Sequence, residues 1–246
     1  MPRFFVTEDS VNKDAGEITI IGDDARHIAR SLRMAVGDEI TVCDGSSMEY
    51  SCVLSYIRDE ECRCSISAEA LSSREPESKI SLYMAYPKGD KMETIIQKAV
   101  ELGASTIVPF ESSRCIKRPK AEKIDKLTAR LNRIAEEAAK QCGRAVIPKV
   151  TEPLSFKEAM SRACECELPL FCYECEDKGT LRGALEGARP STIAVIVGAE
   201  GGFSQDEAEY AVSLGAKKVS LGKRILRCET APLFTLSAIC YELELR

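Results

Sequence analysis

The sequence contains a single histidine, His27, and no tryptophan. A catalytic triad depends on a histidine as its general base, and a lone histidine is more often structural than catalytic, so a triad hydrolase has little support. The glycine patterns G-x-G-x-x-G and G-x-x-x-x-G-K-[ST] are also absent. These patterns mark dinucleotide sites and P-loops, where glycines let the backbone approach phosphate groups. A nucleotide-binding α/β enzyme is therefore disfavoured as well.

Long apolar segments are missing too. No stretch approaches the roughly 20 apolar residues that a helix needs to cross a bilayer. The opening segment MPRFFVTEDS lacks the basic-then-apolar arrangement of a signal peptide. We therefore expect a cytoplasmic protein with no membrane partner.

Cysteine, by contrast, is abundant: the sequence has twelve. Disulfides are disfavoured because a reducing compartment keeps thiols free. The best metal candidate is the group Cys164, Cys166, Cys172 and Cys175. However, Cys172 and Cys175 fall in the run LPLFCYEC, which is typical of a buried strand, and residues three apart on a strand point to opposite faces. We expect no metal, and we interpret the cysteines as small buried hydrophobic residues.

The net charge is −5, and it is unevenly distributed. Residues 1–72 contain 7 basic and 14 acidic residues, whereas residues 112–149 contain 11 basic and 4 acidic residues. A short basic stretch on an acidic protein suits a polyanion that binds at one place. A solvated helix face would give the same composition, and charge alone does not separate these alternatives.

Short strands dominate the first seventy residues. The strand-like runs are residues 2–6, 16–21, 38–45, 49–57 and 63–71, and one helix is expected at residues 23–34. Five short strands and one helix are typical of a small, partly closed β-barrel. The polar segment 71–79 contains Pro76 and has no periodicity, which is typical of a linker. We therefore place the domain boundary between residues 1–72 and 73–246.

Strands and helices alternate in the second domain. Helices are expected at residues 91–104, 121–143, 155–164, 204–216 and 231–245. Strands are expected between them at 79–88, 106–112, 168–174, 192–200 and 217–223. Ser204 and Glu207 form a predicted capping box. Alternation with nearly continuous apolar strands predicts an α/β fold with a parallel sheet that is covered on both faces.

A glycine-rich junction, V-G-A-E-G-G-F-S at residues 197–204, joins a buried strand to a capped helix. Glycines there let backbone N–H groups approach a ligand, and the helix N-terminus adds positive potential. Glu200 would repel a phosphate, so a cationic or hydroxyl-bearing ligand is more compatible. Taken alone, this segment is equally compatible with an ordinary strand-to-helix turn.

A second segment, residues 220–232, lies between a strand and the last helix. It places Lys223, Arg224 and Arg227 beside the apolar pair at residues 225–226, and Glu229 and Thr230 follow. The ends of strands in α/β sheets are where ligands bind. The alternative is a charged loop whose Glu229 or Thr230 only caps the final helix.

Four segments together resemble the signatures of the RsmE-like methyltransferases. Residues 198–204 resemble G-P-E-G-G-[FL]-[ST], and residues 221–231 (L-G-K-R-I-L-R-C-E-T-A) resemble L-G-x-R-I-L-R-x-E-T-A. Residues 97–103 are similar to the family's Q-K-x-x-E-L-G helix, and residues 137–144 to its E-A-x-x-Q-x-x-R helix end. The similarity runs from end to end. Ala199 stands where the family usually has proline, which loosens the loop but removes no reacting group.

The resemblance implies a SPOUT-class enzyme with a PUA-like RNA-binding β-barrel, a deep trefoil knot in the α/β domain and a homodimeric assembly. It implies S-adenosyl-L-methionine as cofactor and N3 of a uridine in 16S rRNA of the small ribosomal subunit as the methyl acceptor. The cofactor would lie across three knot loops, held mostly by backbone groups. The candidate cofactor-binding residues are Leu170, Gly198, Glu200, Gly201, Gly202, Leu221, Gly222, Ile225, Leu226, Arg227, Glu229, Thr230 and Ala231.

Uridine methylation makes definite demands on the protein. A methyl sulfonium is already electrophilic, so the protein must mainly align the reacting atoms. The uracil N3–H must lose its proton to a base, or the charge on the flanking oxygens must be stabilised. Arg227 is the leading electrostatic candidate, because a guanidinium stays charged and offers a fork of donors. Glu200 or Glu229 would be the base, although the sequence does not separate a base from a ribose binder.

RNA-binding candidates fall in two places. Arg26, Arg30 and Arg33 are four and three residues apart, which predicts one face of the first helix, where they contact phosphates or pair with neighbouring acids. The second set precedes and follows the start of the long helix: Arg114, Lys117, Arg118, Lys123, Lys126 and Arg130. The target base must be single-stranded or flipped out.

Two other functions remain open from the sequence. One is a SPOUT methyltransferase that acts on a different RNA, and the other is a non-catalytic RNA-binding assembly factor with a decayed cofactor loop. Arg227, Glu229 and Thr230 are intact, which argues against decay.

Overall fold

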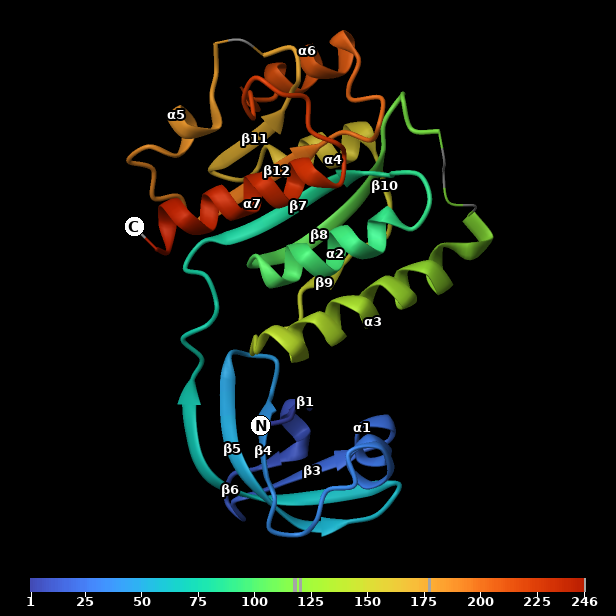
Figure 1. Ribbon diagram of the computed structural model, residues 1–246, viewed down its shortest axis with the longest axis vertical. Coiled ribbons are helices and arrows are strands. Elements are labelled where there is room, and N and C mark those ends of the chain that lie inside the picture. Colours follow the sequence, from blue (N-terminus) through green and yellow to red (C-terminus); the bar gives the residue numbers. More distant parts are fainter. Residues whose placement is uncertain (117–118, 120, 177, 246) are drawn as a thin grey trace. The chain divides into compact units, whose positions relative to one another are not determined.

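The computed structural model describes residues 1–116, 119, 121–176 and 178–245 (Figure 1). The chain forms two compact units. The first contains Met1–Glu75 together with Ala139–Ile147, and the second contains Pro76–Ala138 together with Pro148–Arg246. Each unit has its own sheet.

The first unit is built on a six-stranded sheet with the order β1-β4-β5-β6-β3-β2. Its strands are β1 (Arg3–Phe5), β2 (Val11–Asn12), β3 (Glu17–Ile21), β4 (Glu39–Cys43), β5 (Met48–Ile57) and β6 (Glu61–Leu71). Only β1 and β4 pair in parallel; the other neighbours are antiparallel. The pairing of β5 with β6 contains two register shifts, which bend long strands and increase their twist.

The core of this unit follows the two-residue period of its strands. Ile18 and Ile20 on β3 are buried, as are Cys52 and Leu54 on β5, and Ile28 from the adjoining helix is fully buried with them. Four of the buried core positions are cysteines on neighbouring strands: Cys43, Cys52, Cys62 and Cys64. All twelve cysteines of the chain are free. The thiols in this unit therefore pack as small hydrophobic side chains.

The first helix is shorter than the sequence suggests. It comprises α1 (Asp23–Arg26), a wider π-helical turn, η2 (His27–Ser31), and an end at Leu32. Arg33 has a left-handed backbone, with φ of 52°, and the Met34 amide donates to the Ile28 carbonyl across it. The prediction that Arg33 shares a helix face with Arg26 and Arg30 is therefore wrong, because the chain leaves the helix before Arg33.

The second unit is built on a parallel sheet with the order β10-β8-β7-β12-β11-β13, in which β9 also pairs with β8. Its strands are β7 (Lys79–Ala85), β8 (Ala104–Glu111), β9 (Lys149–Val150), β10 (Leu154–Ser155), β11 (Leu168–Cys172), β12 (Thr192–Val197) and β13 (Lys217–Val219). Every residue of β11 is buried, and all but the first of β12. Consecutive residues of a strand point to opposite faces of the sheet, so their burial means that other elements pack on both faces. The predicted α/β fold with a parallel sheet is therefore confirmed.

Six α-helices surround this sheet within the described residues: α2 (Lys91–Glu101), α3 (Ile124–Cys142), α4 (Phe156–Ala163), α5 (Leu181–Leu185), α6 (Gln205–Ser213) and α7 (Thr230–Leu243). The short turn η3 (Ala121–Lys123) leads into α3, whose last residues belong to the first unit. Helices α2 and α7 lie side by side (Figure 1). None of the helices in the described part of the chain has the length and apolar character of a membrane span.

Phe203 anchors the junction between β12 and α6. It is 1% exposed and packs on Phe171 with ring centroids 4.3 Å apart, and the Phe110 ring is parallel to it with a centroid distance of 6.3 Å. The next residue, Ser204, forms the predicted capping box with Glu207, which is confirmed. The aromatic cluster and the helix cap therefore fix the chain immediately after the glycine-rich loop.

Replacement of Phe203 by Ala should destabilise the second unit by about 4 kcal/mol, because it leaves a cavity among buried rings. The matched control is Val212→Ala on α6, where the side chain is 43% exposed and the expected change is within about 0.5 kcal/mol. Chemical denaturation of both variants checks the difference. Equal stabilities would show that Phe203 does not hold this junction.

Candidate functional site

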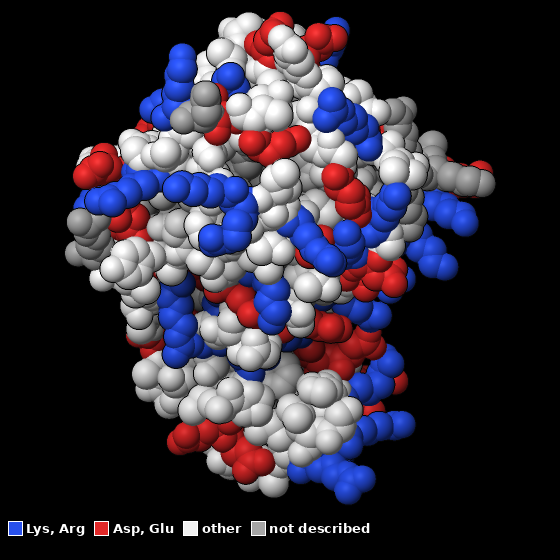
Figure 2. Space-filling view, turned by 45° about the horizontal axis from the view of Figure 1, so that its top comes forward, with Lys and Arg blue, Asp and Glu red and all other residues white. Residues whose placement is uncertain are grey.

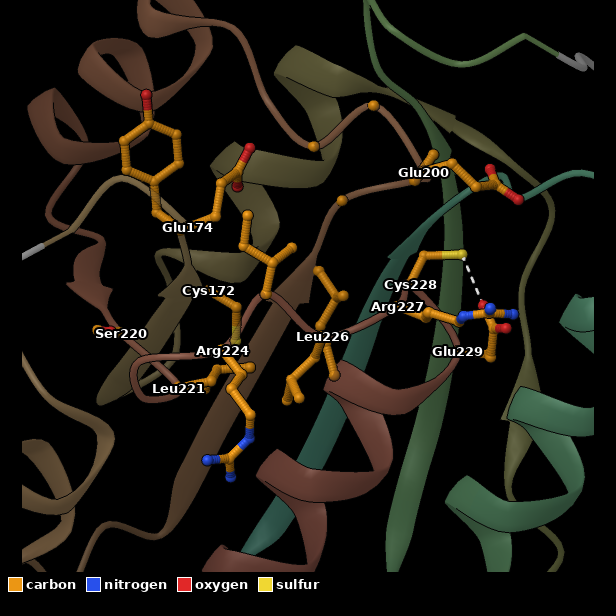
Figure 3. A pocket seen from close by; sticks show the side chains of 18 of the residues that line it. Cys172, Glu174, Glu200, Ser220, Leu221, Arg224, Leu226, Arg227, Cys228 and Glu229 are labelled. Carbon is orange, nitrogen blue, oxygen red and sulfur yellow. Dashed lines mark hydrogen bonds between the residues drawn. The ribbon is translucent and has the colours of Figure 1, made fainter.

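Three loops meet where β11, β12 and β13 end. These strands are neighbours and parallel, so their carboxyl ends lie at one edge of the sheet. The loops follow Cys172, Val197 and Val219, and together they enclose a pocket of about 600 Å³ (Figure 3). Such a volume suits a small organic cofactor.

The pocket collects nearly all of the predicted cofactor-binding residues. All of them line it except Leu170 and Thr230. Leu170 lies inside β11 and is fully buried, and the residues that follow it, Cys172, Tyr173 and Glu174, line the pocket in its place. Thr230 is the first residue of α7.

The glycines let the loop fold tightly on itself. Gly202 has φ of 61°, and its amide donates to the Ala199 carbonyl at 2.9 Å. A Cβ on Gly198 would lie 3.0 Å from the Gly202 Cα, and a Cβ on Gly202 would collide with the Glu174 carboxylate. At Gly201 a Cβ would press on Arg114, whose Nη1 donates to the Gly201 carbonyl at 2.9 Å. Side chains at these positions would therefore deform the pocket wall itself.

The two acids predicted as candidate bases, Glu200 and Glu229, share one cation. The Lys91 Nζ lies 2.9 Å from Glu200 Oε1 and 3.1 Å from Glu229 Oε2. Glu200 also accepts from the Lys88 amide at 3.1 Å. All three charged side chains are between 27% and 34% exposed. Sequence reasoning missed Lys91, although its place soon after the end of β7, the strand next to β12, is a signal that could have found it.

These contacts hold both acids in the charged form. Burial opposes ionisation of Glu200, but the hydrogen bonds from Lys91 and the Lys88 amide lower its pKa below the usual value. Glu229 has a lowered pKa because its own backbone amide, the Cys228 thiol and Lys91 hydrogen-bond to its carboxylate. A carboxylate with a lowered pKa is a weaker base. The geometry thus favours binding and positioning roles for Glu200 and Glu229 over proton abstraction.

Cys228 lies inside this group of charges. Its Sγ donates to Glu229 Oε2 at 3.2 Å and accepts from Lys91 Nζ at 3.7 Å. Burial, with the Glu229 carboxylate adding to it, raises the pKa of Cys228 to about 12. The thiol is therefore protonated at neutral pH and acts as a hydrogen-bond donor rather than a nucleophile.

The arginines of the loop have a different environment. Arg224 and Arg227 are exposed, and neither side chain has a hydrogen bond or ion pair within the described ranges. Figure 3 shows the two side chains leaving the loop in different directions. Both line the pocket, so each guanidinium is available to a ligand.

Four of the nine predicted RNA-binding residues have a partner within the described protein, and one of them is Arg114, which donates to the Gly201 carbonyl. Arg26 lies 3.2 Å from Asp23, Arg30 pairs with Asp59, and Arg130 lies 2.8 Å from Glu93. Lys123 and Lys126 are exposed, whereas Lys117 and Arg118 lie outside the described residues. On the face in Figure 2, basic and acidic side chains are interspersed rather than gathered in one patch.

Metal binding has no support from the described side chains. Among them, no group of three or more histidine, cysteine, aspartate or glutamate residues could hold a metal ion. Cys172 is buried at the end of β11, and Cys175 is exposed.

Comparison with known proteins adds to this geometry. The family model for an RNA methyltransferase domain matches residues 74–240, and that for an RNA methyltransferase PUA domain matches residues 20–67. The ribosomal RNA small subunit methyltransferase E of Bacillus subtilis is 34% identical, over 100% of this chain and 98% of its own length. The chain belongs to the RsmE family of RNA methyltransferases.

Other members of the RsmE family agree in sequence and in fold. The relative from Synechocystis is 32% identical over 90% of this chain and 72% of its own. The crystal structure of the ribosomal RNA small subunit methyltransferase E from Neisseria gonorrhoeae, bound to S-adenosyl methionine, is 31% identical. It superimposes with a TM-score of 0.82 and covers 98% of this chain and 97% of its own. The N-terminal unit is thus of the PUA type.

The raised pKa of Cys228 makes a labelling prediction for this RsmE-family protein. At about pH 8, an alkylating reagent should modify the exposed Cys175 and leave Cys228 unmodified, because the thiolate is the reactive form. Peptide mass spectrometry before and after denaturation measures both sites. Equal modification of the two thiols in the native protein would contradict the buried, protonated Cys228.

Proposed function

We propose that this protein transfers a methyl group from S-adenosyl-L-methionine to N3 of a uridine in 16S rRNA of the small ribosomal subunit. The observation that carries the proposal is the pocket, because two of the four segments that resemble RsmE signatures, residues 198–204 and 221–231, supply most of the lining of one cavity at the sheet edge. The Neisseria gonorrhoeae relative, crystallised with S-adenosyl methionine, supports the choice of cofactor.

The lining of the pocket fits this cofactor. Leu221 and Leu226 supply apolar surface, the tight Gly198–Gly202 loop supplies backbone groups, and Glu200 and Glu229 supply negative charge. Carboxylates suit a ligand that carries an ammonium and a sulfonium group. When bound, the cofactor supplies an electrophilic methyl group. The protein contributes the shape and the charge that orient it.

Arg227 is the residue that we assign to the acceptor base. Removal of the N3 proton places negative charge on the uracil oxygens, and a guanidinium without a partner in the described protein can donate to them. A fixed positive charge also makes the N3 proton easier to lose. Glu200 and Glu229 have lowered pKa values, which makes them weak bases. We therefore assign the stabilisation of the uracil anion to Arg227 and do not assign proton abstraction to either acid.

The PUA-type unit is the proposed RNA-binding domain, for which we retain the boundaries 1–72. Arg26, Arg30 and Arg33 remain its candidate phosphate contacts, because exposed pairs such as Arg26 with Asp23 are weak and exchange readily for phosphate. In the domain at 73–246, Lys123 and Lys126 are exposed candidates without a partner in the described protein, and Arg114 and Arg130 are exposed candidates that have one. A ribosomal RNA substrate implies that the protein works in the cytoplasm, where ribosomes are assembled.

A trefoil knot and a homodimer complete the proposal. For the knot, the support is that Ser220 hydrogen-bonds to both Gly179 and Leu181, which joins the start of the last loop to the end of the 173–180 loop. For the dimer, the support is that α7 is apolar on its outer side as well. Phe234 is 47% exposed and Tyr241 63%, and Ile225 beside the pocket is 85% exposed.

Mass spectrometry of 16S rRNA from cells lacking the protein tests the reaction. One 3-methyluridine should disappear, and purified protein with S-adenosyl-L-methionine should restore it on small ribosomal subunits. If the purified protein methylates transfer RNA and leaves small ribosomal subunits unmethylated, the substrate is a different RNA. Binding of RNA without any methyl transfer would indicate an assembly factor.

Substitution Arg227→Lys tests the mechanism. It keeps the charge but loses the planar fork of donors, so the single-turnover rate should fall by roughly 10²–10³ at saturating RNA and cofactor. Arg224→Lys, in the same loop, is the comparison and should have a smaller effect. A normal chemical step in a stable Arg227→Lys protein would remove Arg227 from the mechanism.

A further inference from the structure

Lys91 occupies an unusual place for a lysine. It is the first residue of α2, where the helix dipole disfavours a cation and favours acidic side chains. Its pairing with Glu200 and Glu229 accounts for its position, because each acid comes from a different pocket loop. Lys91 is thus held by residues that lie 109 or more positions away in the sequence, and not by residues of its own helix.

The three donors of the ammonium group have three partners. These are Glu200 Oε1 at 2.9 Å, Glu229 Oε2 at 3.1 Å and Cys228 Sγ at 3.7 Å. Glu200 belongs to the loop after β12, and Cys228 and Glu229 belong to the loop after β13. The same loops form the pocket walls, and Lys91 itself lines the pocket.

We propose that Lys91 is a positioning residue, whose ammonium group joins the Gly198–Gly202 loop to the 220–231 loop and holds both in the conformation that forms the cofactor pocket. The inference rests on the proposed function, because it assigns Lys91 to the pocket that holds the cofactor. Without Lys91, two carboxylates that shared one cation repel each other. The loops that carry them then separate, and the pocket loses its shape.

Repulsion between carboxylates has a pH signature. With Lys91 present, both acids have lowered pKa values and stay charged in weak acid. Without it, the proximity of two like charges raises the pKa of one of them. As the pH falls through that raised pKa, one carboxyl group takes up a proton and donates a hydrogen bond to the other. Acid should therefore partly restore the pocket in a variant that lacks the lysine.

The test measures binding of S-adenosylhomocysteine by calorimetry at about pH 7 and about pH 5.5. Lys91→Met, which keeps most of the length of the side chain but not its charge, should weaken binding by roughly 10- to 100-fold at the higher pH. The deficit should shrink at the lower pH. Lys91→Arg keeps the charge and should bind more tightly than Lys91→Met. The matched control is Lys98→Met, because Lys98 lies on the same helix and, among the residues that the structure describes, its side chain pairs only with Glu101.

The outcomes separate this inference from the proposed function. If the unaltered protein does not bind S-adenosylhomocysteine, the proposed function fails. If it binds and Lys91→Met binds equally well, the role of Lys91 fails and the function stands. A deficit that is the same at both pH values, and that Lys91→Arg does not reduce, would show that Lys91 acts by packing alone. Melting curves confirm that each variant is folded.

Discussion

Parallel pairing of β7, β12, β11 and β13 is the constraint on which the site depends. In a parallel sheet the carboxyl ends of neighbouring strands share one edge, so the loops that follow them must meet there. Strands β11 and β12 are buried on both faces, which fixes the start of the loops that follow them. Residues far apart in sequence, such as Lys91 and Glu229, thereby come within hydrogen-bonding distance.

The glycine-rich loop shows how packing and binding impose the same residue type. Gly198 and Gly202 approach each other so closely that a side chain at either position would disturb the turn, and Phe203 fixes the next residue in the core. The loop is rigid for structural reasons, and its backbone groups are consequently held ready for a ligand. Alanine in place of the family's proline at position 199 is tolerable in this setting, because the hydrogen bond from Gly202 to Ala199 closes the turn.

The sequence predicted the elements that have a long apolar period and missed those that lack one. Strands β11 and β12 and helix α6 with its cap were recognisable from apolar runs and from Ser204 and Glu207. Strands β2, β9 and β10 contain two residues each, too few for any alternation, and α5 is a single short turn. The early end of the first helix depends on the left-handed backbone of Arg33, which no apolar pattern predicts.

Most residues of the candidate site could be predicted from the sequence, but the ion pairs among them could not. Motif resemblance gave Glu200 and Glu229 as candidates for a base, and nothing local in the sequence shows that a lysine 109 positions before Glu200 is shared between them. That contact argues against the expectation that Glu200 or Glu229 is the base, because pairing with an ammonium group lowers the pKa of a carboxylate and makes it a weaker base. In the described lining of the pocket, the positive charges without a partner are those of Lys223, Arg224 and Arg227 in the last loop. In this site, therefore, Lys91 positions the two carboxylates, and Arg227 is available to stabilise the negative charge that develops on the substrate.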